Sequence, residues 1–184
     1  CRKQVGACKS SVTTVCDGAI THSMHRMGEL WRHREDGIGL EHQATNICVE
    51  AMHQIRVMLP PLPEQPLTAV GGSIETDPYM LPSLMASTCF REIGVQDVNL
   101  GPDVPVDSLL AAAARHKARF LWLSASSCVT PERIPEVIRR LAEGVQQIGA
   151  CAIVGGRALR GMEMPESSSL HMVDSMAELV ALAM

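Results

Sequence analysis

Four prolines fall within residues 60–66, and this segment constrains the fold more than any other part of the sequence. Proline has no backbone N–H and a fixed φ, so a helix cannot continue through such a segment, which favours an extended spacer. No proline occurs before residue 60. We therefore expect an N-terminal part at 1–59, a linker at 60–66 and a second part at 67–184.

Residues 1–59 have the apolar spacing of helices. Ile47, Ala51, Ile55 and Met58 recur at intervals that place them on one face of a helix. Glycines at positions 28, 37 and 39 interrupt the pattern, so several helices are expected rather than one. The sequence predicts a small helical bundle for this part.

After the linker, short apolar runs alternate with helical segments. The runs, which are suited to buried strands, are 67–72, 95–100, 119–124 and 150–154. The helical segments are 81–93, 106–116 and 131–148, and residues 172–184 are expected to form a last strand or a closing helix. Such alternation is typical of a parallel sheet with helices on both faces. The predicted fold class is α/β with an N-terminal all-α part, in which a helical bundle precedes a flavodoxin-like, doubly wound parallel sheet of four or five strands.

The composition disfavours several classes of protein. The formal net charge of −4 lacks the basic excess typical of nucleic-acid-binding modules, so no direct contact with nucleic acid is expected. No run of about 18 apolar residues occurs, so no membrane span is expected. The seven cysteines form no C-x-x-C pair and indicate reduced thiols, as in a cytoplasmic protein. No nucleophile–base pair or phosphate-binding glycine loop is evident, which favours a binding function over an enzyme.

In a doubly wound sheet, ligands bind at the carboxyl ends of the strands. Ser124 and Ser126 follow the third predicted strand, whereas Gly155, Gly156 and Arg157 follow the fourth. Small hydroxyl residues beside paired glycines leave a slot for a flat or elongated ligand, with hydroxyl and backbone N–H groups as donors. Tight packing between strand and helix is the simpler explanation of either loop taken alone.

Three segments of the second part resemble the cobalamin-binding domain of methionine synthase and its relatives. They are V-N-L-G-P-D-V-P at 98–105, L-S-A-S at 123–126 and V-G-G-R-A-L at 154–159. In the N-terminal part, Trp31 is followed after nine residues by Glu41 and His42, which resembles the W-x9-E-H motif of cobalamin-dependent light-sensing transcriptional regulators. The resemblance implies a helical cap over the upper face of the ligand. It also implies a module that forms a homo-oligomer and acts on an effector domain.

The resemblance ends at the residue that would bind cobalt. The family carries D-x-H-x-x-G in the first loop after a strand, where the histidine ligates cobalt from below and the glycine gives room for the nucleotide tail. Here Asp77 is kept, but Tyr79 stands in place of the histidine and Pro82 in place of the glycine. A phenol is a poorer metal ligand than an imidazole. Cobalamin held through a protein histidine is therefore not expected.

Three alternatives remain open: an empty site, a site for cobalamin without the lower histidine, and a site adapted to another chromophore. The third is favoured, because Trp31, Glu41 and His42 persist although the lower-ligand motif is gone. A linear tetrapyrrole such as biliverdin has pyrrole N–H groups, and Glu41 or His42 can accept hydrogen bonds from them. Its two propionates can pair with Arg157, or with arginines at 160 and 32.

The working hypothesis is a light-sensory module that binds biliverdin or a related bilin. The alternatives are an adenosylcobalamin photoreceptor without the lower histidine and a corrinoid subunit of a methyltransferase. No metal site is expected. The candidate cofactor-binding residues are Trp31, Glu41, His42, Asp77, Tyr79, Ser124, Ser126, Gly155, Gly156 and Arg157.

Overall fold

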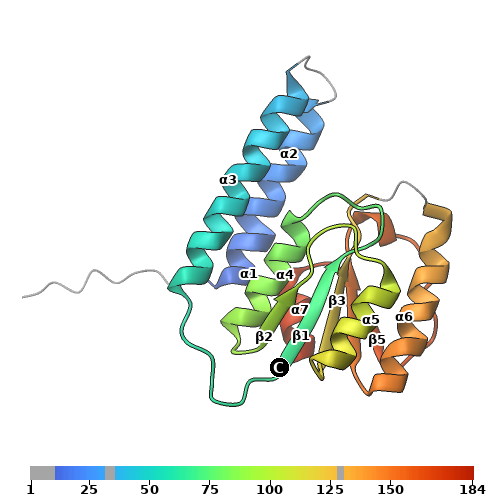
Figure 1. The fold of residues 1–184 in the computed structure, drawn as a ribbon. Helices are drawn as coiled ribbons and strands as arrows, with labels where there is room; N and C mark the ends of the chain where they lie inside the picture. Colours follow the sequence, from blue (N-terminus) through green and yellow to red (C-terminus); the bar gives the residue numbers. More distant parts are fainter. Residues whose placement is uncertain (1–10, 32–35, 128–130) are drawn as a thin grey trace, which may run out of the picture.

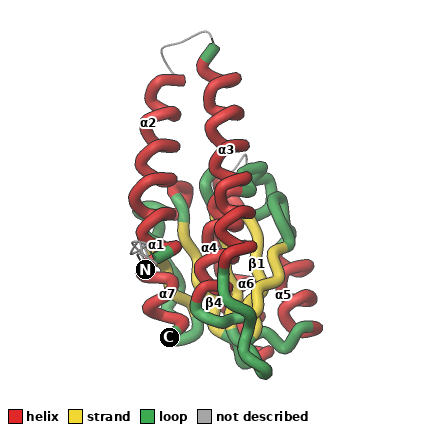
Figure 2. The backbone as a smooth tube through the Cα atoms, turned by 90° about the vertical axis from the view of Figure 1, so that its left-hand side faces the viewer, coloured by secondary structure: helices red, strands yellow, loops and turns green. Residues whose placement is uncertain are grey.

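The structure, a computed structural model, describes residues 11–31, 36–127 and 131–184. A long helical hairpin rises from a layered α/β part (Figure 1). Its first arm is a continuous helical rod made of α1 (Val12–Thr14), the π-helical segment η1 (Val15–Ile20) and α2 (Thr21–Trp31). Its second arm is α3 (Gly37–Met58), which runs beside α2 in the opposite direction (Figure 2). No helix in the described ranges has both the length and the apolar character needed to cross a membrane.

Five parallel strands form one sheet in the order β2-β1-β3-β4-β5. They are β1 (Thr68–Ser73), β2 (Gln96–Asn99), β3 (Phe120–Ser124), β4 (Cys151–Gly155) and β5 (Leu170–Val173). This is the order of a flavodoxin-like doubly wound sheet, so the predicted fold class is confirmed. The tail, expected as strand or helix, contains both, because β5 is followed by α7 (Met176–Ala183).

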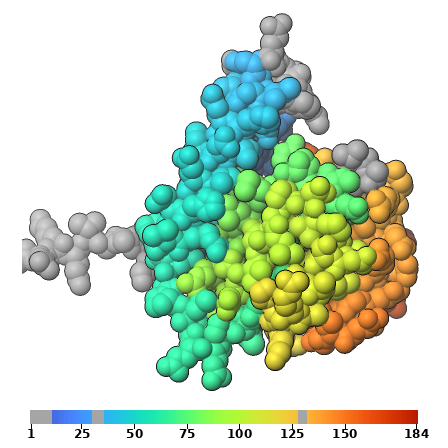
Figure 3. All heavy atoms as spheres, in the orientation of Figure 1, coloured from blue at the N-terminus to red at the C-terminus, as the bar shows by residue number. Residues whose placement is uncertain are grey.

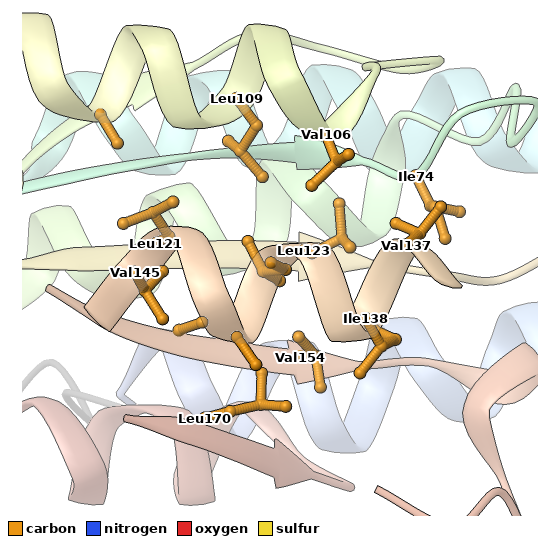
Figure 4. Packing of buried hydrophobic residues seen from close by; sticks show 14 of the residues in the cluster. Ile74, Val106, Leu109, Leu121, Leu123, Val137, Ile138, Val145, Val154 and Leu170 are labelled. Atoms are coloured by element: carbon orange, nitrogen blue, oxygen red, sulfur yellow. The ribbon is translucent and has the colours of Figure 1, made fainter. Parts of the chain in front are cut away.

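Helices cover both faces of the sheet. α5 (Val106–Arg115) and α6 (Ile134–Ile148) pack on one face, where their apolar side chains meet those of the strands (Figure 4). α4 (Leu81–Glu92) and α7 pack on the other face, together with the lower part of the hairpin. Two short turns, η2 (Pro131–Arg133) and η3 (Arg157–Leu159), lie in the loops that follow β3 and β4. Successive residues of β3 alternate between these faces, since Leu121 and Leu123 pack toward α5 and α6 whereas Phe120 and Trp122 pack toward α4.

The hairpin and the α/β part share one hydrophobic core. Cys16 and Met52 of the hairpin are fully buried in the same cluster as Phe90 of α4. At the end of α3, Arg56 Nη2 donates to Asp97 Oδ2 of β2 at 2.8 Å. Residues 59–67, which carry the four prolines, contain no helix or strand and lead from α3 to β1.

The helix expected from Ile47, Ala51, Ile55 and Met58 is present as α3, but the face that these residues share is mostly exposed. Ile47 is 67% exposed and Met58 is 75% exposed, and Ala51 also faces solvent. Met52 is buried in their place, and Ile55 is half-buried against the same core. Helical spacing shows which residues share a face, but not which face meets a neighbour. Here α2 and α4 pack against α3.

Candidate ligand-binding site

A cavity of about 870 Å³ lies where the hairpin meets the carboxyl ends of the strands. One wall comes from η1, α2 and the first turns of α3. The other comes from the ends of β3, β4 and β5 and from the first turns of α4 and α7. Figure 3 shows the hairpin rising beyond the α/β part. Doubly wound sheets bind ligands at this edge, and the volume lies within the range of small-molecule sites.

Eight of the ten residues expected in the site line this cavity: Glu41, His42, Tyr79, Ser124, Ser126, Gly155, Gly156 and Arg157. Arg160, expected as a further cation, lines it too. Asp77 does not line it, because its side chain is buried behind the wall. The Trp31 side chain and Arg32 lie outside the described residues.

Glu41 and His42 come from the second turn of α3. Adjacent helical residues point about 100° apart, yet both line the cavity, because their long side chains converge until Glu41 Oε2 lies 3.7 Å from His42 Nε2. The Glu41 side chain is 20% exposed and also accepts from Thr45 Oγ1 at 3.4 Å. The His42 side chain is 72% exposed. The carboxylate therefore faces the interior of the cavity, and the imidazole stands at its mouth.

Asp77 holds two loops together rather than facing the cavity. Its Oδ1 accepts the backbone N–H of Tyr79 at 3.0 Å, and its Oδ2 accepts those of Ser126 at 2.6 Å and Ser127 at 3.3 Å. Burial raises the pKa of Asp77, while these hydrogen bonds and the charge of Arg157 lower it to a smaller extent. Asp77 thus positions the loop after β1 against the loop after β3, and its carboxylate does not line the cavity.

Tyr79 is fixed through its backbone at both ends. Its N–H donates to Asp77, and its carbonyl oxygen accepts from Ser73 Oγ at 2.6 Å. Ser73 Oγ in turn lies 3.0 Å from Ser124 Oγ. The Tyr79 side chain is 39% exposed and lines the cavity, as does Pro82 in the first turn of α4. The backbone of Tyr79 is therefore fixed on the sheet side of the cavity, and its side chain lines the cavity.

Charged and ionisable groups lie on both walls. Arg157 and Arg160 follow β4, whereas His25, Glu41 and His42 belong to the hairpin. Within the described part of the chain, no three His, Cys, Asp or Glu side chains lie close enough together to hold a metal ion. The sheet side thus offers two arginines and the carboxylate of Asp174, and the hairpin side offers the carboxylates of Glu41 and Asp17.

The two glycines after β4 are required by neighbouring backbone. Gly156 has a φ of +124°, and a Cβ there would lie 2.3 Å from the carbonyl oxygen of Ala125. A Cβ on Gly155 would lie 2.8 Å from the carbonyl oxygen of Val173. Close packing of the loops after β3, β4 and β5 therefore explains both glycines, which also line the cavity.

Trp122 is a site residue that no sequence motif indicated. Its side chain is 1% exposed and forms part of the cavity floor. The indole N–H donates to Ser83 Oγ at 2.9 Å, and Ser83 donates to Asn99 Oδ1 at 2.9 Å. The ring lies against Gly71, where a Cβ would be 2.0 Å from the indole. The sequence does place Trp122 two positions before Ser124 in the predicted strand, and residues at this spacing point to the same side of the sheet.

Asp17 is a second site residue that local sequence did not indicate. Its carboxylate accepts the backbone N–H of Met176 at 2.8 Å and that of Ala177 at 3.0 Å. Ser175 caps the same end of α7 by accepting from the N–H of Glu178 at 3.1 Å. A helix N-terminus favours an anion. The chain's own carboxylate fills this place at the edge of the cavity.

Comparisons with known proteins agree on the fold. No sequence family matches the chain, and no curated protein sequence does. Solved structures do match, and the fold they share with this chain is that of corrinoid proteins. The cobalamin-binding type of fold expected from the resemblance is thus confirmed. Light sensing and bilin binding stay predictions.

Three solved structures represent this fold. The monomethylamine corrinoid protein of Methanosarcina barkeri is 19% identical, with a TM-score of 0.70 over 95% of this chain and 83% of that one. A chain of the methanol:cobalamin methyltransferase complex of the same organism is 18% identical, with a TM-score of 0.56 over 94% of this chain and 66% of that one. A cobalamin-binding protein of Desulfitobacterium hafniense is 16% identical, with a TM-score of 0.51 over 94% of this chain and 93% of that one. At these identities the likeness shows the fold alone.

Proposed function

We propose that this chain is a corrinoid-binding module that holds the ring in the cavity between the hairpin and the sheet. The observation that carries the proposal is the cavity itself, which lies at the carboxyl ends of the strands and is lined on its other wall by α2 and α3. The fold shared with corrinoid and cobalamin-binding proteins supports this class of ligand over the biliverdin favoured from the sequence.

The lining residues fit a large ring with polar substituents. Leu81, Met85 and Ile153 provide apolar surface inside the cavity. A corrin ring carries amide side chains around its edge, which can accept hydrogen bonds from Arg157 and donate to Glu41. These two residues stand on opposite walls. The chain therefore offers an apolar interior with polar contacts at its rim.

The residues do not fit a bond from the protein to cobalt on the sheet side. Tyr79 is the residue presented there, and the histidines among the described lining residues, His25 and His42, belong to the hairpin. We therefore propose that the ring is held without a lower protein ligand. When bound, a corrinoid supplies metal-centred chemistry and visible absorption. The chain's own residues bind the ring, orient it and exclude water.

The arrangement of the lining residues favours binding over catalysis by this chain. The hydroxyl of Ser124 is within hydrogen-bond distance of Ser73, and the carboxylate of Asp77 is used by backbone N–H groups. We propose that the module, with its ligand bound, acts together with a protein partner. This is an enzyme that uses the corrinoid, as in a methyltransferase, or a second copy of the chain in a sensory assembly.

A linear tetrapyrrole is the second candidate, and the charge distribution of the cavity favours it. Arg157 and Arg160 lie near each other in the chain after β4, on the wall opposite Glu41. Two arginines match the two propionates of biliverdin, and a carboxylate matches its pyrrole N–H groups. In this case the ligand would absorb red light, and the module would be a light sensor.

Absorption spectroscopy of the purified full chain tests the proposal. The protein is incubated separately with cobinamide, hydroxocobalamin and biliverdin, and each sample is then desalted. Retention of a corrinoid with shifted bands supports the proposed function. Retention of biliverdin alone, with a red-shifted band, replaces it by the second candidate. Retention of none of the three refutes tetrapyrrole binding.

A further inference from the structure

On the side that faces α4, the cavity floor is formed in part by Trp122. Trp122 projects from β3 toward α4 and is 1% exposed. Phe90 of α4 is fully buried beside it, with the two ring centroids 5.5 Å apart. Phe120 stacks on the far side of Phe90 at 5.8 Å. Aromatic rings therefore fill the space between the sheet and α4, from the cavity floor into the core.

Trp122 is held in this position by its surroundings. Its indole N–H donates to Ser83, and Ser83 donates to Asn99, whose Oδ1 also accepts the N–H of Gly101 at 3.0 Å. The ring is pressed against Gly71, which has no side chain to displace it. Turning the indole away would leave a buried N–H without its acceptor, which is unfavourable. The floor is therefore a fixed part of the fold.

Pro82 and Tyr79 line the cavity beside this floor. Pro82 lies in the first turn of α4 and adds a ring without a backbone N–H. Tyr79 is fixed through its backbone by Asp77 and Ser73. The sheet side of the cavity thus carries bulky groups beside the indole of Trp122.

Tetrapyrroles differ in how much room they need beside the ring. Cobalamin carries a nucleotide on a long arm, and this nucleotide requires room beside the ring whether it is folded beneath the ring or extended into the protein. Cobinamide and linear bilins carry only short side chains. We infer that the site selects tetrapyrroles that lack a nucleotide loop, an inference that rests on the proposed function. Trp122 is the residue that excludes the loop.

Equilibrium titrations of the full chain with cobinamide and cobalamin, followed by absorption, test this inference. Because the two corrinoids share the ring, the ratio of their Kd values isolates the effect of the nucleotide loop. We expect cobinamide to bind at least about tenfold more tightly than cobalamin. Equal binding, or tighter binding of cobalamin, overturns the inference and leaves the proposed function standing. Binding of biliverdin alone, like failure of all three probes, refutes the proposed function and the inference with it.

Substitutions of Trp122 test whether this residue excludes the nucleotide loop. In Trp122→Ala, the Kd of cobalamin should come to within about threefold of that of cobinamide. Phe90→Ala is the matched control, because it removes a ring that is equally buried but does not line the cavity, and the ratio should stay as in the wild type. Circular dichroism checks that each variant folds. Trp122→Phe, a smaller change, should give an intermediate ratio if Trp122→Ala does not fold. An unchanged ratio in a folded Trp122 variant contradicts the role given to this residue.

Discussion

The carboxylate of Asp17 accepts the backbone N–H of Met176 at 2.8 Å, which ties the first arm of the hairpin to the N-terminus of α7. The second arm is tied at its far end, where Arg56 contacts Asp97 of β2. The cavity lies between the hairpin and the strand ends, with Asp17 on its edge. These two contacts therefore fix the hairpin, which forms one wall of the cavity, relative to the α/β part, which forms the other wall.

Asp17→Asn tests the first of these contacts. The substitution removes the negative charge at the N-terminus of α7 and leaves one of two acceptor oxygens, so the free energy of unfolding should fall by about 1 kcal/mol. Urea denaturation followed by circular dichroism measures the change. Glu143→Gln is the control, because its ion pair with Arg139 is exposed and it lies beyond the first turn of α6, so it should contribute little. Equal losses in the two variants would contradict the anchoring role of Asp17.

Arg56→Met tests the second contact. It leaves the Asp97 carboxylate, whose side chain is 6% exposed, without its cation. Breaking this partly buried pair, while Ser87 still donates to Asp97, should lower the free energy of unfolding by about 2 kcal/mol. Arg139→Met removes an exposed arginine that lies between Glu136 and Glu143, and it should have little measurable effect. Similar denaturant midpoints for Arg56→Met and the wild type would show that the pair does not hold the hairpin.

Gly156→Ala tests the close packing of the loop after β4 against the loop after β3. The positive φ and the approach to Ala125 should together lower the free energy of unfolding by more than about 2 kcal/mol. Gly149→Ala provides the comparison, because Gly149 also has a positive φ, of +68°, but a Cβ there meets nothing within 4 Å. That variant should lose only about 1 kcal/mol. Thermal melts that rank Gly149→Ala as the more damaging change would contradict this account of the loop.

Asp77 gives the stability a pH dependence of defined sign. Burial raises its pKa above the unfolded value of 3.8, so the folded chain keeps the proton at pH values where the unfolded chain has lost it. This contribution to stability is fully present below the unfolded pKa and is lost as the pH rises through the folded pKa. The free energy of unfolding of the wild type minus that of Asp77→Asn should therefore decrease as the pH rises above 3.8. Urea titrations at a series of pH values measure this difference, and an increase with pH would contradict the sign.

The sheet and its helices were predictable because their signals are local. The run 120–124 is buried on both faces of the sheet, and Gly94, with a φ of +80°, follows α4 as a helix-ending glycine does. The buried face of α3 was not predictable, because Met52 rather than Ile47 meets α4 and the core. That choice depends on where distant helices pack.

The position of the site was predictable from the sequence, but the roles of its residues were predictable only in part. Loops at the ends of parallel strands converge, so Ser124 and Arg157 meet at one cavity as expected. The role of Asp77 differs, because backbone N–H groups of a distant loop use its carboxylate. The contact of Asp17 with Met176 joins residues 159 positions apart, and nothing in the local sequence of either indicates the other.

The most direct test of the account is to measure ligand affinity with one variant on each wall of the cavity. Titrations use whichever of cobinamide, hydroxocobalamin and biliverdin the wild type binds most tightly. Glu41→Gln on the hairpin and Arg157→Met on the sheet side should each raise the Kd by about tenfold. Arg133→Met, whose guanidinium pairs with Glu75 at 3.4 Å outside the cavity, should leave the Kd unchanged. Wild-type affinity in both wall variants, or no binding of any of the three ligands, would contradict a tetrapyrrole held between hairpin and sheet.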